Sequence, residues 1–425
     1  MLTAAKTGTG ASLVDAYAYQ YDASGNRTLE QINSSVTTSG YNDLNQMTNR
    51  SGGGQLAVSG SLSQPGIVTV GSAPPYVTGS GTTFSATVPV VTGDNSIQVS
   101  ATNANGYGAT HTLVVNVTSG TPISALISDS NGNLTYDGTM NYVWDSANRL
   151  VKIWYGPISS SSSTTMSYDG VGRRVQILES GSSGAVTSTK NLIWDGMNIC
   201  EEKNASGTIT KSYFPQGVRL GGSNYYYTRD HLGSVRELTD ASATVQARYD
   251  YDPYGRQTQV SGTMNADFGF TGLYVHQPSG LNLALYREYS ASLGRWTSRD
   301  PIGDPNLNVL SKDGNLISLS GWPDEPAEIR AGSNLYEYVN NDPIRKLDSW
   351  GLYGAFADFF SCMTPCKHIY WCVVAGFSFN HSDPRNWSYM YAVAARMMNT
   401  GCRRCDNKIF TTGCQNMMYA YKEYW

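Results

Sequence analysis

The sequence predicts a mainly β protein, and three observations support this. The 425 residues include 44 Gly and 29 Tyr. Only 15% of the residues are charged, against about 25% in an average globular domain. A short pattern of an aromatic, an Asp or Asn, a turn and an alternating strand also recurs along the chain. Turn-rich sequences with few helix formers are typical of antiparallel sheets.

The composition excludes several classes of protein. No apolar run approaches the ~18 residues of a membrane-spanning helix, so we expect no transmembrane segment. The first twenty residues lack the apolar core of a Sec signal peptide. The net charge of -4 gives no basic surface, which argues against nucleic acid as a partner of the β part. No cofactor motif is visible, and we expect no cofactor.

The repeated pattern predicts one β-hairpin per unit. Its Asp or Asn can accept hydrogen bonds from backbone N–H groups two residues on, and the Gly or Asn that follows accommodates a positive φ. We expect the aromatic ring to cover the next hairpin, with its hydroxyl left in water. A lone hairpin is unstable, so the units are expected to stack. The units are Tyr21–Arg27, Tyr41–Met47, Trp144–Leu150, Tyr168–Arg173 and Tyr249–Arg256.

These units resemble the YD (RHS) repeat family, whose hairpins spiral into a hollow β shell. The resemblance covers residues 17–52 and 122–303, and its later motifs look like the RHS-repeat-associated core. These motifs are Asp230–Arg236, Tyr251–Gly255, Phe270–Gly272, Leu285–Tyr289 and Leu293–Gly303. The family resemblance implies a partial cocoon, because an enclosing shell needs more hairpins than this chain supplies. We therefore expect a truncated chain, a partial wrap or one part of an assembly.

The chain divides into five predicted parts. YD repeats occupy residues 1–57 and 121–250, and the RHS-repeat-associated core occupies 251–352. Between the repeats, residues 58–120 alternate apolar and polar residues at short spacing, which predicts a small antiparallel sandwich. This insert resembles bacterial Ig-like domains; we expect a spacer, with carbohydrate binding as the alternative. Residues 353–425 form the last part.

Two acidic motifs carry the predicted chemistry. They are Asp300-Pro301-Ile302-Gly303 and Asp348-Ser349-Trp350-Gly351-Leu352. The family resemblance implies that Asp300 and Asp348 form an aspartic-protease-like pair that cuts between Leu352 and Tyr353. Two adjacent carboxylates cannot both ionise cheaply, so the pair shares a proton, and one member activates water while the other polarises the carbonyl. Arg299 is predicted either to orient Asp300 or to form an ordinary salt bridge, and Pro301, Gly303 and Gly351 to support the turns.

Two features depart from the family pattern. Ser349 stands where the family has Pro, which removes a fixed φ. Residues 304–332 look like an insertion between the motifs, and we interpret them as a surface excursion. The alternative role of Asp300 and Asp348 is that of turn-capping carboxylates in an inactive relative.

Residues 353–425 differ from the rest of the chain. They contain six of the seven cysteines and carry a charge of +3, while residues 1–352 carry -7. Apolar residues at 356–377 and a helical pattern at 387–398 predict a small helical domain. In the family this region is the variable effector, often a toxin. The cysteines are Cys362, Cys366, Cys372, Cys402, Cys405 and Cys414.

The tail cysteines permit three interpretations. Disulfides formed after export are favoured, without an assignable pairing. A zinc site would use Cys402 and Cys405 with Cys362 and Cys366, or with His368, but one CxxC is a weak signal and we assign no metal. A Cys/His nucleophile has no local signature.

The sequence thus predicts an RHS-type polymorphic toxin, or a fragment of one, that cleaves itself to free its effector. Its own C-terminal segment would be the cargo, and a cognate immunity protein and a secretion-system component would be partners. We expect secretion or surface display by a specialised, non-Sec route. The alternative is a non-enzymatic surface or adhesion protein that binds carbohydrate or a partner cell.

Overall fold

The structure, a computed structural model, describes residues 2–7, 13–71, 82–117, 125–301, 308–310, 316–318 and 334–352. The regular structure in these residues is almost entirely β-strand, with short 3-10 turns that include η2 (Phe270–Gly272) and η4 (Val339–Asn341). The predicted mainly β fold is confirmed. The predicted helical, cysteine-rich part at 353–425, with all six of its cysteines, lies outside the described residues.

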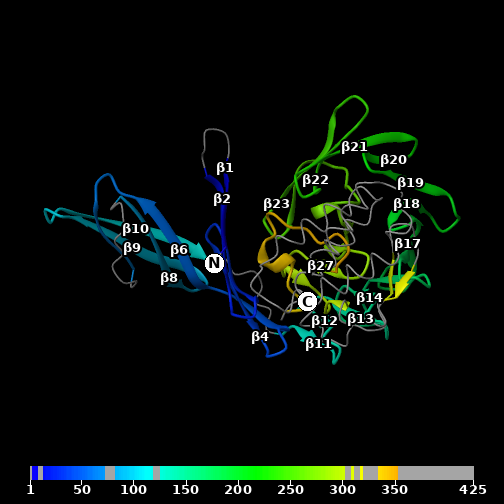
Figure 1. Cartoon of the computed structure of the whole chain (residues 1–425), viewed down its shortest axis with the longest axis horizontal. Coiled ribbons are helices and arrows are strands. Elements are labelled where there is room, and N and C mark those ends of the chain that lie inside the picture. Colours follow the sequence, from blue (N-terminus) through cyan, green and yellow to red (C-terminus); the bar gives the residue numbers. More distant parts are fainter. Residues whose placement is uncertain are drawn as a thin grey trace, which may run out of the picture.

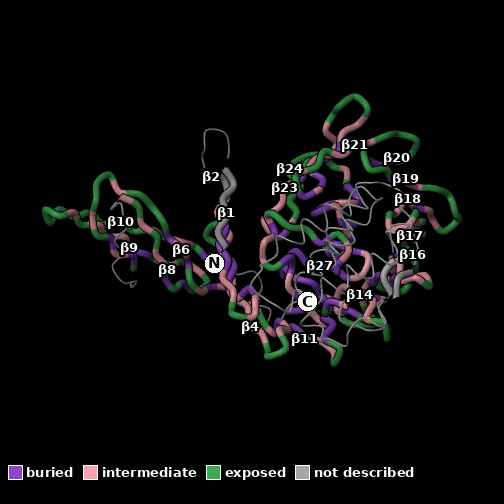
Figure 2. The backbone as a smooth tube through the Cα atoms, in the orientation of Figure 1, coloured by how far each residue is buried: buried purple, intermediate pink, exposed green. Residues whose placement is uncertain are grey.

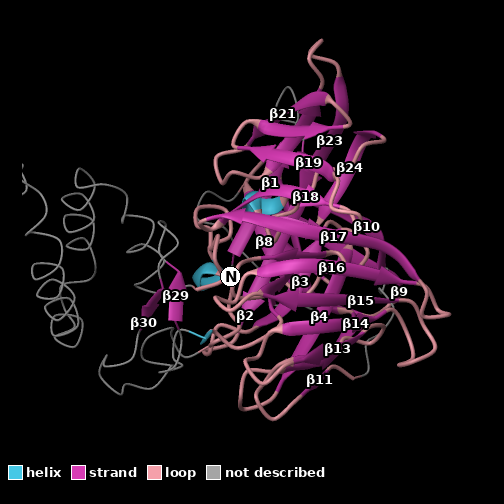
Figure 3. Ribbon diagram, turned by 90° about the vertical axis from the view of Figure 1, so that its right-hand side faces the viewer, coloured by secondary structure: helices cyan, strands magenta, loops and turns pink. Residues whose placement is uncertain are grey.

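A 14-stranded antiparallel sheet forms the main wall of the molecule. Each strand pairs with its neighbours in the chain, so the sheet order is the sequence order. Figure 1 shows this wall curling around β27, and Figure 3 shows its strands stacked in succession from β11 upward. The strands are β11 (Ile127–Ser128), β12 (Leu134–Tyr136), β13 (Asn141–Trp144), β14 (Leu150–Trp154), β15 (Ser163–Tyr168), β16 (Arg174–Ser180), β17 (Val186–Asp195), β18 (Asn198–Lys203), β19 (Ile209–Phe214), β20 (Gly217–Leu220), β21 (Ser223–Arg229), β22 (Val235–Thr239), β23 (Val245–Tyr251) and β24 (Gln257–Gly262).

A five-stranded sheet contains the N-terminal repeats. Its strands also follow chain order: β1 (Leu2–Thr7), β2 (Leu13–Tyr21), β3 (Arg27–Ile32), β4 (Ser35–Tyr41) and β5 (Met47–Gly52). The Leu126 N–H donates to the Thr48 carbonyl at 2.9 Å, and Met47 packs in the same apolar cluster as Leu134 of the main wall. The two groups of repeats are therefore adjacent, although the insert separates them in sequence.

The predicted sandwich region forms two small sheets. One pairs β6 (Gly54–Ser61) with β8 (Thr83–Val90); the other has the order β10 (Gly108–Val117), β9 (Gly93–Asn103), β7 (Gly66–Val70). Valines from both sheets share one buried cluster, which also contains Leu29 and Val36 of the first sheet. The two sheets thus share an apolar core with β3 and β4. Their Ig-like character and the domain boundaries stay predictions.

A four-stranded sheet lies inside the curve of the main wall. It comprises β25 (Tyr274–His276), β26 (Leu281–Leu283), β27 (Glu288–Ser290) and β28 (Arg295–Trp296), and a separate hairpin pairs β29 (Asn308–Leu310) with β30 (Leu316–Ser318). Leu281 and Leu283 pack against Leu150, Ile153 and Ile177 of the wall. Figure 2 shows buried residues on the inner side of the wall, while the outer hairpin ends are exposed. The core of this half therefore lies between wall and inner sheet.

The repeated turns confirm the predicted hydrogen bond to the N–H two residues on and show a second bond, to the N–H four residues on. In the turn after β2, Asp22 Oδ1 accepts from the Ser24 N–H at 3.0 Å and from the Asn26 N–H at 2.8 Å, and Gly25 has φ +80°. The same two bonds, to residues two and four positions on, recur at Asn42, Asp145, Asp169, Asp230 and Asp252. One side-chain oxygen thus organises each reversal.

The prediction that the repeat hydroxyls stay in water was wrong. At the end of one strand, Tyr41 donates through Oη to the carbonyl of Arg27, the first residue of the preceding strand, at 2.9 Å. The same bond to the first residue of the preceding strand is made by Trp144, Tyr168, Trp194 and Tyr251, at 2.7 to 2.9 Å. Each aromatic therefore links two successive turns by its polar end as well as by its ring.

Substituting Tyr251 with Phe tests this link. The variant keeps the ring but leaves the Val235 carbonyl without its 2.9 Å partner. We expect the free energy of unfolding to fall by about 1 kcal/mol, measured by urea denaturation. Tyr226→Phe, on an exposed side chain of β21, is the matched control and should change stability by less than about 0.5 kcal/mol. Equal effects in the two variants would contradict the role of the hydroxyl.

Candidate active site

The two predicted aspartates lie together in the interior. Asp300 follows β28 and is 5% exposed, and Asp348 follows η4 and is 1% exposed. The Asp300 N–H donates to the Leu335 carbonyl at 2.9 Å, so the upstream and downstream motifs meet through backbone as well as side chains. The two motifs thus meet although residues 304–347 separate them in sequence.

Arg287, just before β27, joins the two carboxylates. Its Nη2 lies 2.7 Å from Asp300 Oδ2 and 3.2 Å from Asp348 Oδ2. Its remaining nitrogens donate to backbone carbonyls, Nε to Gly351 at 2.6 Å and Nη1 to Leu335 at 3.1 Å. The guanidinium is buried and lies 4.3 Å from the ring centroid of Trp296. One guanidinium therefore binds both carboxylates and two carbonyls of the downstream segment, residues 334–352.

Arg287 lies in the Leu285–Tyr289 motif, but the sequence predicted Arg299 as the residue that supports the acidic pair. In the structure the Arg299 side chain is exposed, and its stem lies against Gly132. A signal for Arg287 was present, since it follows the mostly apolar stretch 281–286, in which Asn282 is the polar residue. An Arg next to a buried strand needs an acidic partner, because an unpaired buried charge is strongly destabilising.

Asp348 is fixed by the backbone beyond it. Its Oδ1 accepts from the Gly351 N–H at 2.9 Å and from the Leu352 N–H at 3.0 Å. This is a close variant of the repeat turn, and it forms with Ser349 in place of the family's Pro. Leu352 is 1% exposed. The predicted cleavage residue is thus bonded directly to one member of the acidic pair.

Burial is the main influence on the protonation of Asp348. It raises the pKa of this carboxyl, while Arg287 and the backbone N–H groups of Leu352 and Gly351 act in the opposite direction. Two carboxyls that share one cation inside the protein titrate as a pair, so a single proton held between them is chemically accessible. This arrangement can supply one acid and one base at the same place.

Gly351 is required by space and by backbone conformation. Its φ is +76°, and an added Cβ would lie 3.0 Å from the Cβ of Arg287 and 3.1 Å from its backbone N. We expect Gly351→Ala to lower the free energy of unfolding by about 1–3 kcal/mol, measured by urea denaturation. Gly184→Ala also changes a positive-φ glycine but meets open space, so it isolates the backbone cost. An equal loss in both variants would contradict a role for the contact with Arg287.

The other predicted site residues divide between described and undescribed parts. Pro301 is half-buried and follows Asp300 directly, whereas Gly303, Tyr353 and the tail cysteines lie outside the described residues. Within the described residues, no cluster of three or more His, Cys, Asp or Glu side chains could hold a metal ion. The helices described there include none with the length and apolar character needed to cross a bilayer.

Comparison with known proteins found a nuclease and a deaminase toxin among the relatives. The chain is 27% identical over 234 residues to a tRNA3(Ser)-specific nuclease WapA of Bacillus spizizenii, which covers 52% of this chain and 9% of the relative. It is 21% identical over 251 residues to the double-stranded DNA deaminase toxin A of Burkholderia cenocepacia, covering 52% of this chain and 16% of the relative. The chain therefore spans a small fraction of the length of these relatives. No family model matches.

Solved structures also resemble the chain. A Photorhabdus luminescens Tc holotoxin pore shares 16% identity with a TM-score of 0.41, covering 83% of this chain and 18% of that one. A TcdB2–TccC3 complex shares 16% identity with a TM-score of 0.39, covering 80% of this chain and 17% of that one.

Proposed function

We propose that this chain, an RHS/YD-repeat protein, cuts itself after Leu352 and thereby frees residues 353–425 as a toxin. The observation that carries the proposal is the pair of buried aspartates on Arg287, one of which also binds the Leu352 N–H. The bound N–H belongs to the peptide group between residues 351 and 352, and the proposed scissile bond, between Leu352 and Tyr353, is the next peptide bond. Folding therefore supplies the proximity that a separate protease obtains by binding its substrate.

The chemistry follows from the shared proton. Asp300, with the shorter contact to Arg287, is the ionised base that removes a proton from water. The water oxygen attacks the Leu352 carbonyl carbon while Asp348, whose pKa is raised by burial, donates its proton to the carbonyl oxygen. Asp300 then passes the proton that it took from water to the Tyr353 nitrogen, and the C–N bond breaks. One hydroxyl proton of the intermediate returns to Asp348, which leaves the Leu352 carboxyl and the free Tyr353 amine as products. One water is consumed and no cofactor is needed.

The relatives support the toxin half of the proposal. The WapA proteins and the deaminase are named as a tRNA nuclease and a DNA deaminase toxin, activities of those proteins. By analogy, residues 353–425 would be the effector and a cognate immunity protein would protect the producing cell. Delivery would be by secretion or surface display through a specialised route. Disulfides in the tail would fit such an exported effector.

The cut is tested on the purified chain. On a denaturing gel the wild type is expected to run as two fragments, and N-terminal sequencing should place the start of the smaller one at Tyr353. Because the reaction is intramolecular, its first-order rate should not change with protein concentration. A chain that stays intact from pH 4 to pH 8 would overturn the proposal, and glycan binding by that uncut chain would favour an adhesin.

The toxin is tested separately. Induced expression of residues 353–425 in bacteria is expected to arrest growth, while residues 1–352 expressed at the same level should not. If the tail is harmless and the chain still cuts itself, the cleavage proposal stands and the toxin assignment fails.

A further inference from the structure

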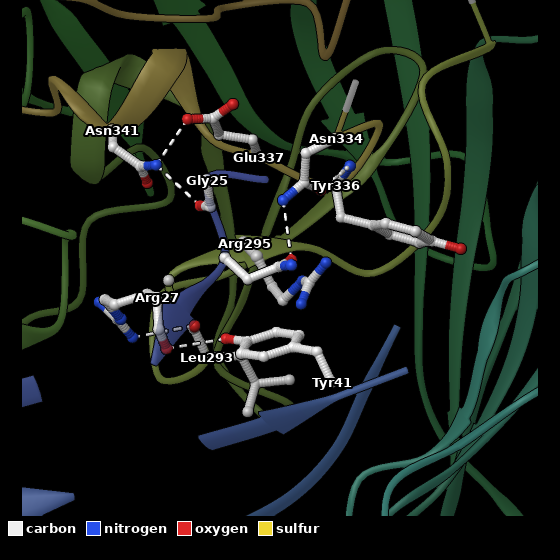
Figure 4. A pocket seen from close by; sticks show the side chains of 11 residues that line it. Gly25, Arg27, Tyr41, Leu293, Arg295, Asn334, Tyr336, Glu337 and Asn341 are labelled. Atoms are coloured by element: carbon white, nitrogen blue, oxygen red, sulfur yellow. Dashed lines mark hydrogen bonds between the residues drawn. The ribbon is translucent and has the colours of Figure 1, made fainter. Parts of the chain in front are cut away.

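The first repeat turn contacts the segment that leads to Asp348. A small polar pocket, with room for about one water molecule, lies between this turn, the loop before β28 and residues 334–341. In Figure 4 the Asn341 amide bonds to both Gly25, in the turn between β2 and β3, and Glu337, while Asn334 bonds to the residue that follows Gly25. Residues from opposite ends of the described chain thus line one site.

Two asparagines make the contact specific. Asn334 Nδ2 donates to Asn26 Oδ1 at 2.8 Å, and both side chains are buried. Asn341 Nδ2 donates to the Gly25 carbonyl at 2.8 Å, and its Oδ1 accepts from Tyr254 Oη at 3.1 Å. These amides use both their donor and acceptor sides, so the contact has one fitting orientation.

Charged side chains line the pocket and constrain residues 334–341. Arg27 and Arg295 line it from the first repeat and from β28, and Glu337 lines it from the segment itself. Burial raises the pKa of Glu337 to about 7, and its carboxyl lies against Gly25, where an added Cβ would meet it at 3.1 to 3.2 Å. A side chain at position 25 would therefore have to displace the Glu337 carboxyl, and the φ of +80° at Gly25 disfavours it as well.

The contact lies next in sequence to Leu335, which is bonded to Arg287 and to Asp300. Asn334 precedes Leu335, whose carbonyl accepts from Arg287 Nη1 at 3.1 Å and from the Asp300 N–H at 2.9 Å. A shift of Asn334 moves this carbonyl, and with it the guanidinium that touches both carboxylates. The first repeat and the acidic pair are therefore mechanically connected.

We propose that Asn26, Asn334 and Asn341 are positioning residues, through which the first repeat holds the acidic pair in its cleaving geometry. The inference rests on the proposed function and adds a requirement to it: an intact core is not enough for cleavage unless the first repeat is docked.

Two isosteric variants test the proposal. Asn334→Asp keeps the Oδ1 that accepts the Tyr336 N–H but places a carboxylate oxygen against Asn26 Oδ1. Asn341→Asp places a carboxylate oxygen against both the Gly25 carbonyl and Glu337 Oε1, which the Asn341 amide binds in the wild type. We expect each to slow cleavage at least about ten-fold, because small displacements of reacting groups are costly. Asn191→Asp, which breaks an equivalent 3.0 Å bond to the Asn204 carbonyl within the wall, should cut at the wild-type rate.

The pH profile separates positioning from loss of folding. The titratable and charged groups that face Asp348 are Arg287, Asp300 and Tyr338. If Leu335 moves and Arg287 loosens its hold, both carboxyl pKa values rise and the rate optimum moves to higher pH. A variant that only folds less completely would lower the rate equally at every pH. Such uniform scaling, or a wild-type rate in both variants, would overturn this inference; an uncut wild type would instead overturn the proposed function.

Discussion

Replacing Asp348 with Asn is expected to leave the chain in one piece. Asn keeps the Oδ1 that accepts the Gly351 and Leu352 N–H groups, so the turn survives, but it can neither hold nor release the shared proton. Asp300→Asn removes the proposed base, which contacts the same Arg287 nitrogen as Asp348, and should have the same effect. We expect the first-order rate of cleavage to fall by at least about a thousand-fold in each, followed on denaturing gels.

The matched control for these variants is Asp169→Asn in a wall turn. Asp169 also accepts two backbone N–H bonds and pairs with an arginine, Arg173, but it is partly exposed and far along the chain from the pair. It should cut at the wild-type rate. Cleavage of Asp348→Asn and Asp300→Asn at that same rate would assign the two aspartates to turn capping and remove the catalytic interpretation.

Loss of Arg287 is expected to lower the free energy of unfolding as well as to abolish cleavage. Arg287→Met leaves two buried carboxylates without their cation and removes the donor to the Gly351 carbonyl. The Leu335 carbonyl loses one of its two donors and keeps the Asp300 N–H. Breaking a buried ion pair from one side costs about 3–5 kcal/mol. The loss is to be measured by urea denaturation, with the uncut Asp348→Asn chain as the reference for Arg287→Met. Arg287→Lys should also fail to cut, because one ammonium cannot replace the fork.

The Arg287→Met defect should depend on pH with a defined sign. Without the cation, burial raises the carboxyl pKa values in the folded state above those of the unfolded chain. The folded state then binds more protons, so stability falls as pH rises from the unfolded carboxyl pKa near 4 toward the folded values. The variant should therefore be closest to its reference in acid. Arg149→Met, which removes a partly exposed pair with Asp145, should cost less than about 1 kcal/mol and vary little with pH.

The local chemistry of the repeats was predictable from sequence. An Asp or Asn followed by Gly or Asn predicts the reversal itself, and the structure confirms it at Asp22, Asn42 and Asp145. The destination of the aromatic hydroxyl was not predictable, because it depends on which carbonyl the neighbouring turn presents. Tyr41 and Tyr251 reach across a strand pair, and only the register of that pair places Arg27 or Val235 within bonding distance.

The candidate site was predictable only in part for a similar reason. Asp300 and Asp348 were identified by resemblance, and the structure brings them together on Arg287; their catalytic role stays a prediction. Arg287 was missed because adjacency in sequence favoured Arg299, whereas burial decides which arginine reaches the acids. The contacts of Asn26 could not be foreseen, since its partner Asn334 lies 308 residues away in the chain.

The chain-order pairing of the wall has a consequence for folding. Every strand of the 14-stranded sheet pairs with its immediate neighbours, so these contacts have low contact order and can form as each hairpin leaves the ribosome. The acidic pair depends on the opposite kind of contact, between Asn26 and Asn334. Loop-closure entropy makes such long-range contacts late. During synthesis, the 14-stranded wall would therefore fold before the acidic pair that is proposed to cut after Leu352 is assembled.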